Sequence, residues 1–183
     1  MQLMSAASRT AASQPREPLA GQIAAALRAG RFDPQHAGEL FLRADAEQAI
    51  RAALGGSATL AVAGRDEGRV RAASFLGARF VPDLVVEAPG RGRVAVTITL
   101  LRSDPGPVTA VLAGALVLAV RYDAVVAFIL DRRLGKPDPF GAGEGDEAPA
   151  RGLGEAERQL LEQLRDRWHI WLEVRRQDPF GWE

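Results

Sequence analysis

The pattern of apolar and polar positions along the chain predicts two helices and a strand in its first third. From Pro18 to Gly30 apolar residues recur at helical spacing, with proline near the start and glycine at the end. A second helix is expected over Asp45–Gly56, where Asp45 begins a capping box and two glycines end the segment. The apolar run over Ser57–Gly64 then predicts a strand.

The middle of the chain carries the signals of a hairpin, a helix and a buried strand. Two apolar runs within Phe80–Leu101 flank the Gly-rich turn Glu87–Arg93, which predicts a β-hairpin. Nearly every position from Val108 to Tyr122 is apolar, and there the small residues and the preceding proline favour a buried helix. Asp123–Arg133 has the composition of a strand buried on both faces. The distance along the chain from hairpin to strand suits a right-handed crossover between parallel strands.

The last third is predicted to hold a loop, a helix and a strand. Residues 134–154 are rich in Gly, Pro and acidic residues, which is typical of a long loop. A helix is expected over Gly154–Trp168 and a strand over His169–Gln177. The whole order predicts an α/β fold with a mixed sheet of about five strands flanked by helices.

The length of 183 residues fits a single domain. We place it over residues 18–178, with a disordered N-terminal arm over 1–17 and a C-terminal tail over 179–183. The start of the chain lacks the apolar stretch of a signal peptide, and the longest apolar run is too short to cross a bilayer. A cytoplasmic protein with no membrane partner is the expectation.

Charge and composition exclude some kinds of functional site and make others less expected. The 23 basic and 23 acidic residues cancel, which lowers the expectation of a dedicated nonspecific nucleic-acid binder. The chain has no cysteine, and this excludes disulfides, thiolate metal sites and a thiol nucleophile. Its two histidines, His36 and His169, belong to no metal-binding motif.

The predicted hairpin holds the candidate site. Pro82-Asp83 opens its first strand, and Thr97 and Thr99 interrupt the aliphatic second strand. This order, with an apolar helix after the hairpin, resembles the PD-(D/E)XK nuclease superfamily over roughly residues 57–133. The resemblance implies a restriction-endonuclease-like α/β fold. In that family the Asp of one strand meets an acidic residue and a Lys of the next. Residues two apart on a strand share a face, so the two carboxylates can hold Mg²⁺ while the Lys polarises water or phosphate.

Two of the three positions depart from the family pattern. Thr97 and Thr99 stand where the family has its acidic residue and its Lys. A neutral hydroxyl supplies neither the negative charge that binds a hard cation nor the positive charge of lysine. Asp83 alone would be a weak Mg²⁺ site. The resemblance therefore implies a nuclease-like domain that has lost catalysis and acts in nucleic-acid or protein binding or assembly, with no cofactor.

Two alternatives stay open. The first is a divergent, Mg²⁺-dependent nuclease in which Glu87 joins Asp83, because both residues share a face if the strand is regular. The second is an unrelated α/β protein-interaction module, in which Asp83 is a turn residue after proline and the threonines are ordinary strand formers.

Candidate partner contacts come from arginines and aromatic residues. Nucleic-acid contacts are assigned to Arg79, Arg91, Arg93 and Arg102. The motif DPFG occurs twice, at 138–141 and 178–181, and suggests a tail that docks in a protein partner.

A homodimer is also expected, because the chain has no net charge to keep copies apart. In the final strand the aliphatic residues should face the core, which leaves Trp171 on the opposite face and in need of cover. The core-facing residues are Ile170, Leu172 and Val174, and the interface residues are Trp171, Phe180 and Trp182.

Overall fold

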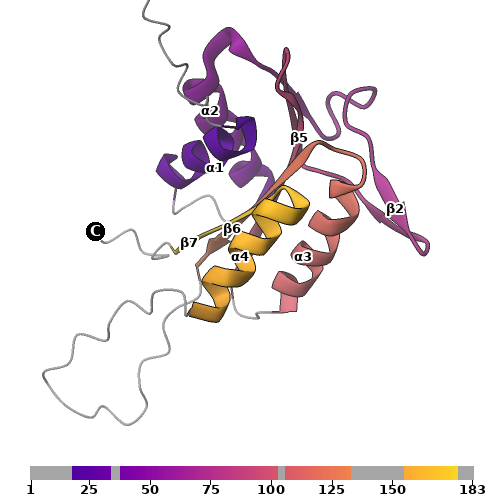
Figure 1. The fold of residues 1–183 in the computed structure, drawn as a ribbon. Coiled ribbons are helices and arrows are strands. Elements are labelled where there is room, and N and C mark those ends of the chain that lie inside the picture. The colour runs from indigo at the N-terminus through magenta and orange to yellow at the C-terminus, as the bar shows by residue number, and fades with distance from the viewer. Residues whose placement is uncertain (1–17, 34–37, 103–105, 133–154, 177–183) are drawn as a thin grey trace, which may run out of the picture.

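The computed structural model describes residues 18–33, 38–102, 106–132 and 155–176, which are built around one five-stranded sheet (Figure 1). The strands are ordered β1-β4-β5-β6-β7 across the sheet. Neighbours from β1 to β5 pair antiparallel, whereas β5, β6 and β7 run parallel. The predicted mixed sheet is confirmed. The strand bounds are Thr59–Val62 for β1, Leu84–Ala88 for β4, Gly92–Leu101 for β5, Ala124–Asp131 for β6 and Ile170–Arg176 for β7.

Helices cover both faces of the sheet (Figure 1). One face carries α1 (Leu19–Ala29) and α2 (Glu39–Leu54), and the other carries α3 (Gly106–Ala119) and α4 (Glu155–Trp168). A 3₁₀ turn, η1 (Gly55–Ser57), follows α2. Two short strands, β2 (Ala73–Phe75) and β3 (Ala78–Phe80), form a separate hairpin beside α3.

Each central strand contributes to two cores, because successive side chains of a strand point to opposite faces. Leu84 and Val86 of β4 belong to the core under α1 and α2, whereas Val85 belongs to the core under α3. Every residue of β6 is buried. The strand that the sequence predicts to be buried on both faces is therefore confirmed.

The start of the second helix differs from the sequence prediction. α2 begins at Glu39 rather than Asp45, and its buried residues are Leu42, Ala46 and Ile50. These three lie at helical spacing, so burying Leu42 extends the helix towards its N-terminus. Asp45 lies inside the helix, where its Oδ2 accepts a hydrogen bond from the backbone N–H of Asp33 at 3.3 Å.

The remaining predicted elements agree with the structure within a few residues. These are the first helix, the hairpin of β4 and β5, the apolar helix α3, the final helix and the final strand. The expected arm over 1–17, loop over 134–154 and tail over 179–183 lie outside the described residues.

Candidate functional site

Asp83, Thr97 and Thr99 line one hollow of about 360 Å³ between the sheet and α3. Leu84 pairs with Val96 in the register of β4 and β5, so Asp83 lies opposite Thr97 and shares its face. Gly114 of α3 lies against the ring of Phe80, which closes one wall. The structure thus brings together the three positions that the hairpin pattern singled out.

The Asp83 carboxylate has a partner on each oxygen. Oδ2 accepts a hydrogen bond from the backbone N–H of Ile98 at 2.8 Å. Oδ1 accepts one from Nη2 of Arg43, a residue of α2, at 2.5 Å. The backbone of Asp83 bonds to both neighbouring strands, through Val96 on one side and Ala63 on the other. Asp83 is therefore fixed in position by contacts within the chain.

Burial raises the pKa of Asp83 above its ordinary value, because a charged carboxylate loses hydration in the hollow. The Ile98 N–H and the Arg43 guanidinium act in the opposite direction by stabilising the ionised form, and Glu39 adds to the rise by repulsion. The net direction is upward. Arg43 is thus the main side chain that keeps a partly buried Asp83 ionised.

The two threonines offer hydroxyls but no charge to the hollow. Oγ1 of Thr97 is buried and, within the described residues, has no hydrogen-bond partner. Thr99 is partly buried at the rim. A hydroxyl can donate and accept hydrogen bonds, but it cannot balance the charge of a divalent cation.

Glu87 lies away from this hollow. It is four residues beyond Asp83, which is about 13 Å along a strand. Its exposed carboxylate lies 3.7 Å from Nε of Arg93. Among the described residues no group of three His, Cys, Asp or Glu side chains could hold a metal ion.

The four arginines assigned to nucleic acid do not form one surface. Arg79 of β3 lines the hollow. Arg91 donates to Oε1 of Gln22 at 2.9 Å, and the guanidinium of Arg93 lies 5.5 Å from the centre of the Tyr122 ring. Both of these therefore make contacts within the protein near the hairpin turn. Arg102 follows β5 at the opposite end of that strand and is exposed.

Arg43 is the residue of the site that sequence reasoning missed. The second helix was expected to begin after it, which left Arg43 in a connecting segment. The helical spacing of Leu42 with Ala46 and Ile50 is the signal that places it on α2. No sequence signal pairs it with Asp83, because the two lie in different elements 40 positions apart.

Trp171 packs inside the chain. It is partly buried against the core under α1 and α2, while Ile170 and Leu172 belong to the other core as expected. Val174 is half exposed. Because α1 covers the face of β7 that carries Trp171, that indole needs no second chain to cover it. Phe180, Trp182 and both DPFG motifs lie outside the described residues.

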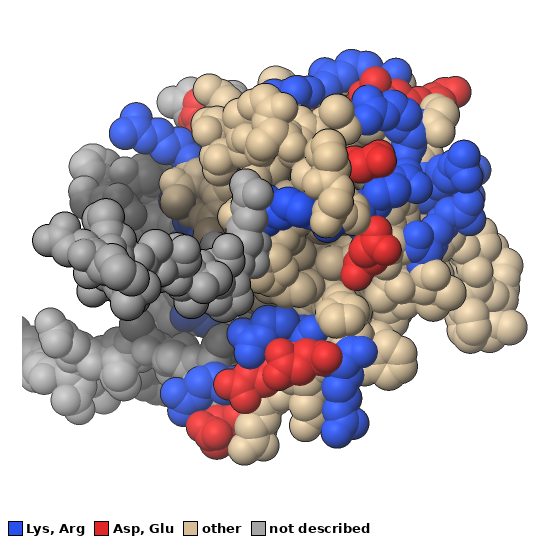
Figure 2. Space-filling model, turned by 45° about the horizontal axis from the view of Figure 1, so that its top comes forward, with Lys and Arg blue, Asp and Glu red and all other residues tan. Residues whose placement is uncertain are grey.

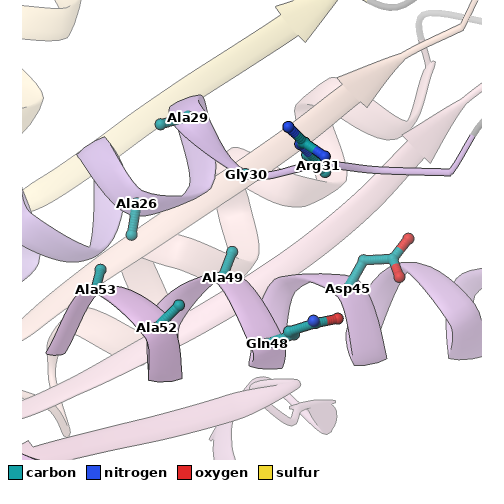
Figure 3. A pocket seen from close by; sticks show the side chains of 9 residues that line it. All are labelled: Ala26, Ala29, Gly30, Arg31, Asp45, Gln48, Ala49, Ala52 and Ala53. Atoms are coloured by element: carbon teal, nitrogen blue, oxygen red, sulfur yellow. The ribbon is translucent and has the colours of Figure 1, made fainter. Parts of the chain in front are cut away.

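A second hollow, of about 450 Å³, lies between α1 and α2 (Figure 3). Alanines from both helices form most of its wall, and Arg31, Asp45 and Gln48 lie towards one end (Figure 3). A Cβ at Gly30 would lie 2.9 Å from Cβ of Ala49, so the glycine permits the close approach of the two helices. Because methyl groups form most of its wall, this hollow has fewer groups that could bind or react with a ligand than the Asp83 hollow has.

Comparison with known proteins does not assign the chain to a family. No family model, curated protein or solved structure matches the chain. In the described part of the chain, no helix has both the length and the apolar character needed to cross a membrane.

Proposed function

We propose that this protein is a nuclease-like domain that has lost catalysis and acts by binding or assembly. The observation that carries the proposal is the Arg43–Asp83 pair. In a metal-dependent nuclease the carboxylate at this position holds a divalent cation. Here a guanidinium contacts the carboxylate, and the remaining oxygen accepts the Ile98 N–H.

The arrangement of elements supports the proposal. A hairpin of β4 and β5 leads through α3 to β6, which lies parallel to β5. Asp83 and the two threonines then share one hollow, as the resemblance to PD-(D/E)XK nucleases implies. The positions are nuclease-like, whereas the residue types are not.

Charge explains the loss of catalysis. A metal ion at Asp83 would have to displace Arg43 from a 2.5 Å contact and would gain only neutral hydroxyls from Thr97 and Thr99. Mg²⁺ demands several oxygen ligands in near-octahedral geometry. The divergent nuclease that uses Glu87 is disfavoured by distance, since about 13 Å along the strand separates Glu87 from Asp83.

The test is a cleavage assay with single- and double-stranded DNA and RNA in Mg²⁺ and in Mn²⁺. We expect no cleavage above that of Asp83→Ala. Cleavage by the wild-type chain that Asp83→Ala abolishes would support the metal-dependent nuclease instead. Glu87→Ala would then show whether Glu87 takes part, and Asp123→Ala is a control at an exposed carboxylate outside the hollow.

The kind of partner needs a second measurement. Fluorescence anisotropy with labelled nucleic acids at physiological salt separates nucleic-acid binding from protein binding. If nucleic acid is the partner, Arg79→Ala should weaken binding, because Arg79 lines the hollow. Arg167→Ala on α4 is the control, since it removes an exposed arginine elsewhere. Absence of binding would favour a protein partner, which is also what the unrelated interaction module requires.

A further inference from the structure

An apolar groove of about 600 Å³ lies between α3 and the β2–β3 hairpin, apart from the Asp83 hollow. Four of its apolar wall residues recur at helical spacing along one side of α3 and the residue after it, and two more apolar residues come from the hairpin, on either side of Ser74. The six residues are Ala113, Leu116, Val117 and Val120 on the helical side and Ala73 and Phe75 on the hairpin.

The groove and its rim expose large apolar side chains. Leu76 is 90% exposed, Val120 89% and Phe75 60%. Thr109 is the sole polar side chain in the sequence of α3, GPVTAVLAGALVLA. A helix that is apolar on all sides is normally covered on all sides. The outer side of α3 therefore has the composition of a contact surface.

The conformation of Leu76 strengthens this interpretation. Phe75 pairs with Ala78, so Leu76 and Gly77 form a two-residue hairpin turn, and their φ angles are +48° and +82°. Such turns prefer Asn, Asp or Gly at the first position. A branched apolar residue there costs about 1–2 kcal/mol. Leu76 fits neither the preference of the turn nor the core of the described residues, and such strain is typical of a functional surface.

One end of the groove is basic. Arg121 lines it, and the hydroxyl of the adjacent Tyr122 accepts from the backbone N–H of Arg71 and donates to its carbonyl oxygen. The guanidinium of Arg93 lies over the Tyr122 ring. Arg121 is thus the basic residue of the groove wall, and Arg93 is a second basic side chain at the adjacent Tyr122. Figure 2 shows basic side chains that border an uncharged area on the right of the molecule.

The two carboxylates near this end already have contacts. Oδ2 of Asp123 accepts the backbone N–H of Arg93 at 2.7 Å, and Glu87 lies 3.7 Å from Nε of Arg93. Among the described residues, no acidic side chain lines the groove itself. The charge that complements this end is therefore negative.

We infer that the groove binds an amphipathic peptide segment of another protein, whose apolar side chains enter the groove and whose Asp or Glu residues lie beside Arg121. A nucleic acid would leave the apolar walls unused. A second copy of the chain would bring the same apolar wall and the same arginines. The inference is independent of the proposed function, because it does not involve Asp83.

The experiment is a selection of phage-displayed random peptides on the full chain. Peptides that carry regularly spaced apolar residues together with Asp or Glu are expected. A synthetic copy of one such peptide should bind the wild-type chain in fluorescence anisotropy. Val120→Glu and Arg121→Glu should each weaken binding by about tenfold or more. Leu40→Glu is the matched control, since Leu40 is an exposed leucine of α2, and it should bind like the wild type.

The variant Leu76→Asn distinguishes a loss of peptide binding from a loss of folding stability. Asparagine suits a positive φ, so this variant should unfold at the same urea concentration or a higher one. It should nevertheless bind the peptide more weakly, because the exposed anchor is gone. Equal binding by Leu76→Asn and Val120→Glu, enrichment of basic peptides, or no enrichment would each overturn the inference. So would a dimer in light scattering that Val120→Glu dissociates, because a second copy would then occupy the groove.

Discussion

Nη2 of Arg43 lies 2.5 Å from Oδ1 of Asp83 and joins α2 to the hairpin that carries the candidate site. The side chains are 23% and 20% exposed, so the pair is largely removed from water. Removing one partner of a partly buried pair destabilises the fold more than removing one partner of an exposed pair, because the remaining charge stays desolvated without a counter-charge. The contact thus stabilises the fold at the position where the proposed nuclease-like arrangement would have its metal ion.

Arg43→Met should destabilise the fold by about 1–3 kcal/mol at neutral pH, because it leaves the Asp83 carboxylate without its cationic partner. Urea denaturation of variant and wild type gives this difference. Arg51→Met on the same helix is the control, since the Arg51 side chain is about half exposed and its partner Glu47 also pairs with Arg65, so Arg51 should contribute about 0.3–0.5 kcal/mol.

The destabilisation caused by Arg43→Met should depend on pH. Burial raises the pKa of Asp83 in the folded state, and without Arg43 that pKa rises further. A carboxyl group whose pKa is raised in the folded state destabilises that state at pH values above that pKa. This destabilisation disappears as the pH falls through the pKa and the group becomes protonated. The difference between wild type and Arg43→Met should therefore shrink on acidification. A difference that is constant across that range would contradict this role for Asp83.

Thr97→Val should leave the free energy of unfolding unchanged or raise it by up to about 1 kcal/mol. Its buried Oγ1 has no partner among the described residues, and removing an unsatisfied hydroxyl relieves a desolvation penalty. Thr59→Val is the control, because Oγ1 of Thr59 accepts from Nη2 of Arg69 at 2.7 Å. That variant should lose about 0.5–1.5 kcal/mol. Urea denaturation decides, and a larger loss at Thr97 than at Thr59 would contradict the assignment.

Gly92→Ala should destabilise the hairpin more than Gly90→Ala does. Both glycines have positive φ, +82° and +70°, so both substitutions strain the backbone. A Cβ at Gly92 would also lie 2.7 Å from Oδ2 of Asp123, whereas one at Gly90 meets nothing within 4 Å. We expect a difference of about 1 kcal/mol or more in urea denaturation, because Asp123 must shift and release the Arg93 N–H. Equal losses would show that the Asp123 contact is unimportant.

Trp171→Ala should lower stability by about 2–4 kcal/mol without changing the mass in solution, because the indole packs under α1 rather than against another chain. Light scattering and urea denaturation measure the two effects. A homodimer remains a prediction. A dimer that Trp171→Ala converts to monomer, with little loss of stability, would restore Trp171 to an interface.

Much of the fold follows from sequence because the signals are local. The turn Glu87–Arg93 and the aliphatic runs beside it predict β4 and β5, and uniform burial of β6 follows from its continuous apolar composition. The predicted start of α2 was wrong, because Asp45 does not cap the helix. Its carboxylate accepts a hydrogen bond from the backbone N–H of Asp33 instead. The β2–β3 turn also escapes prediction, since Leu76 is not a residue that two-residue turns prefer.

The candidate site follows from sequence only in part. Asp83, Thr97 and Thr99 meet because strand pairing and alternation fix which residues share a face. Their partner Arg43 comes from a helix on another part of the chain, and such long-range pairing leaves no mark in a single sequence. The wall of the apolar groove is equally non-local, since it joins α3 to the β2–β3 hairpin.

The most direct test of the central claim is a Mn²⁺ titration of the wild-type chain followed by electron paramagnetic resonance, with Asp83→Ala as reference. If Arg43 has taken the place of the metal ion, both proteins should leave the same amount of Mn²⁺ free at every concentration. A wild-type chain that binds Mn²⁺ while Asp83→Ala does not would contradict the account and return the protein to the metal-dependent nucleases.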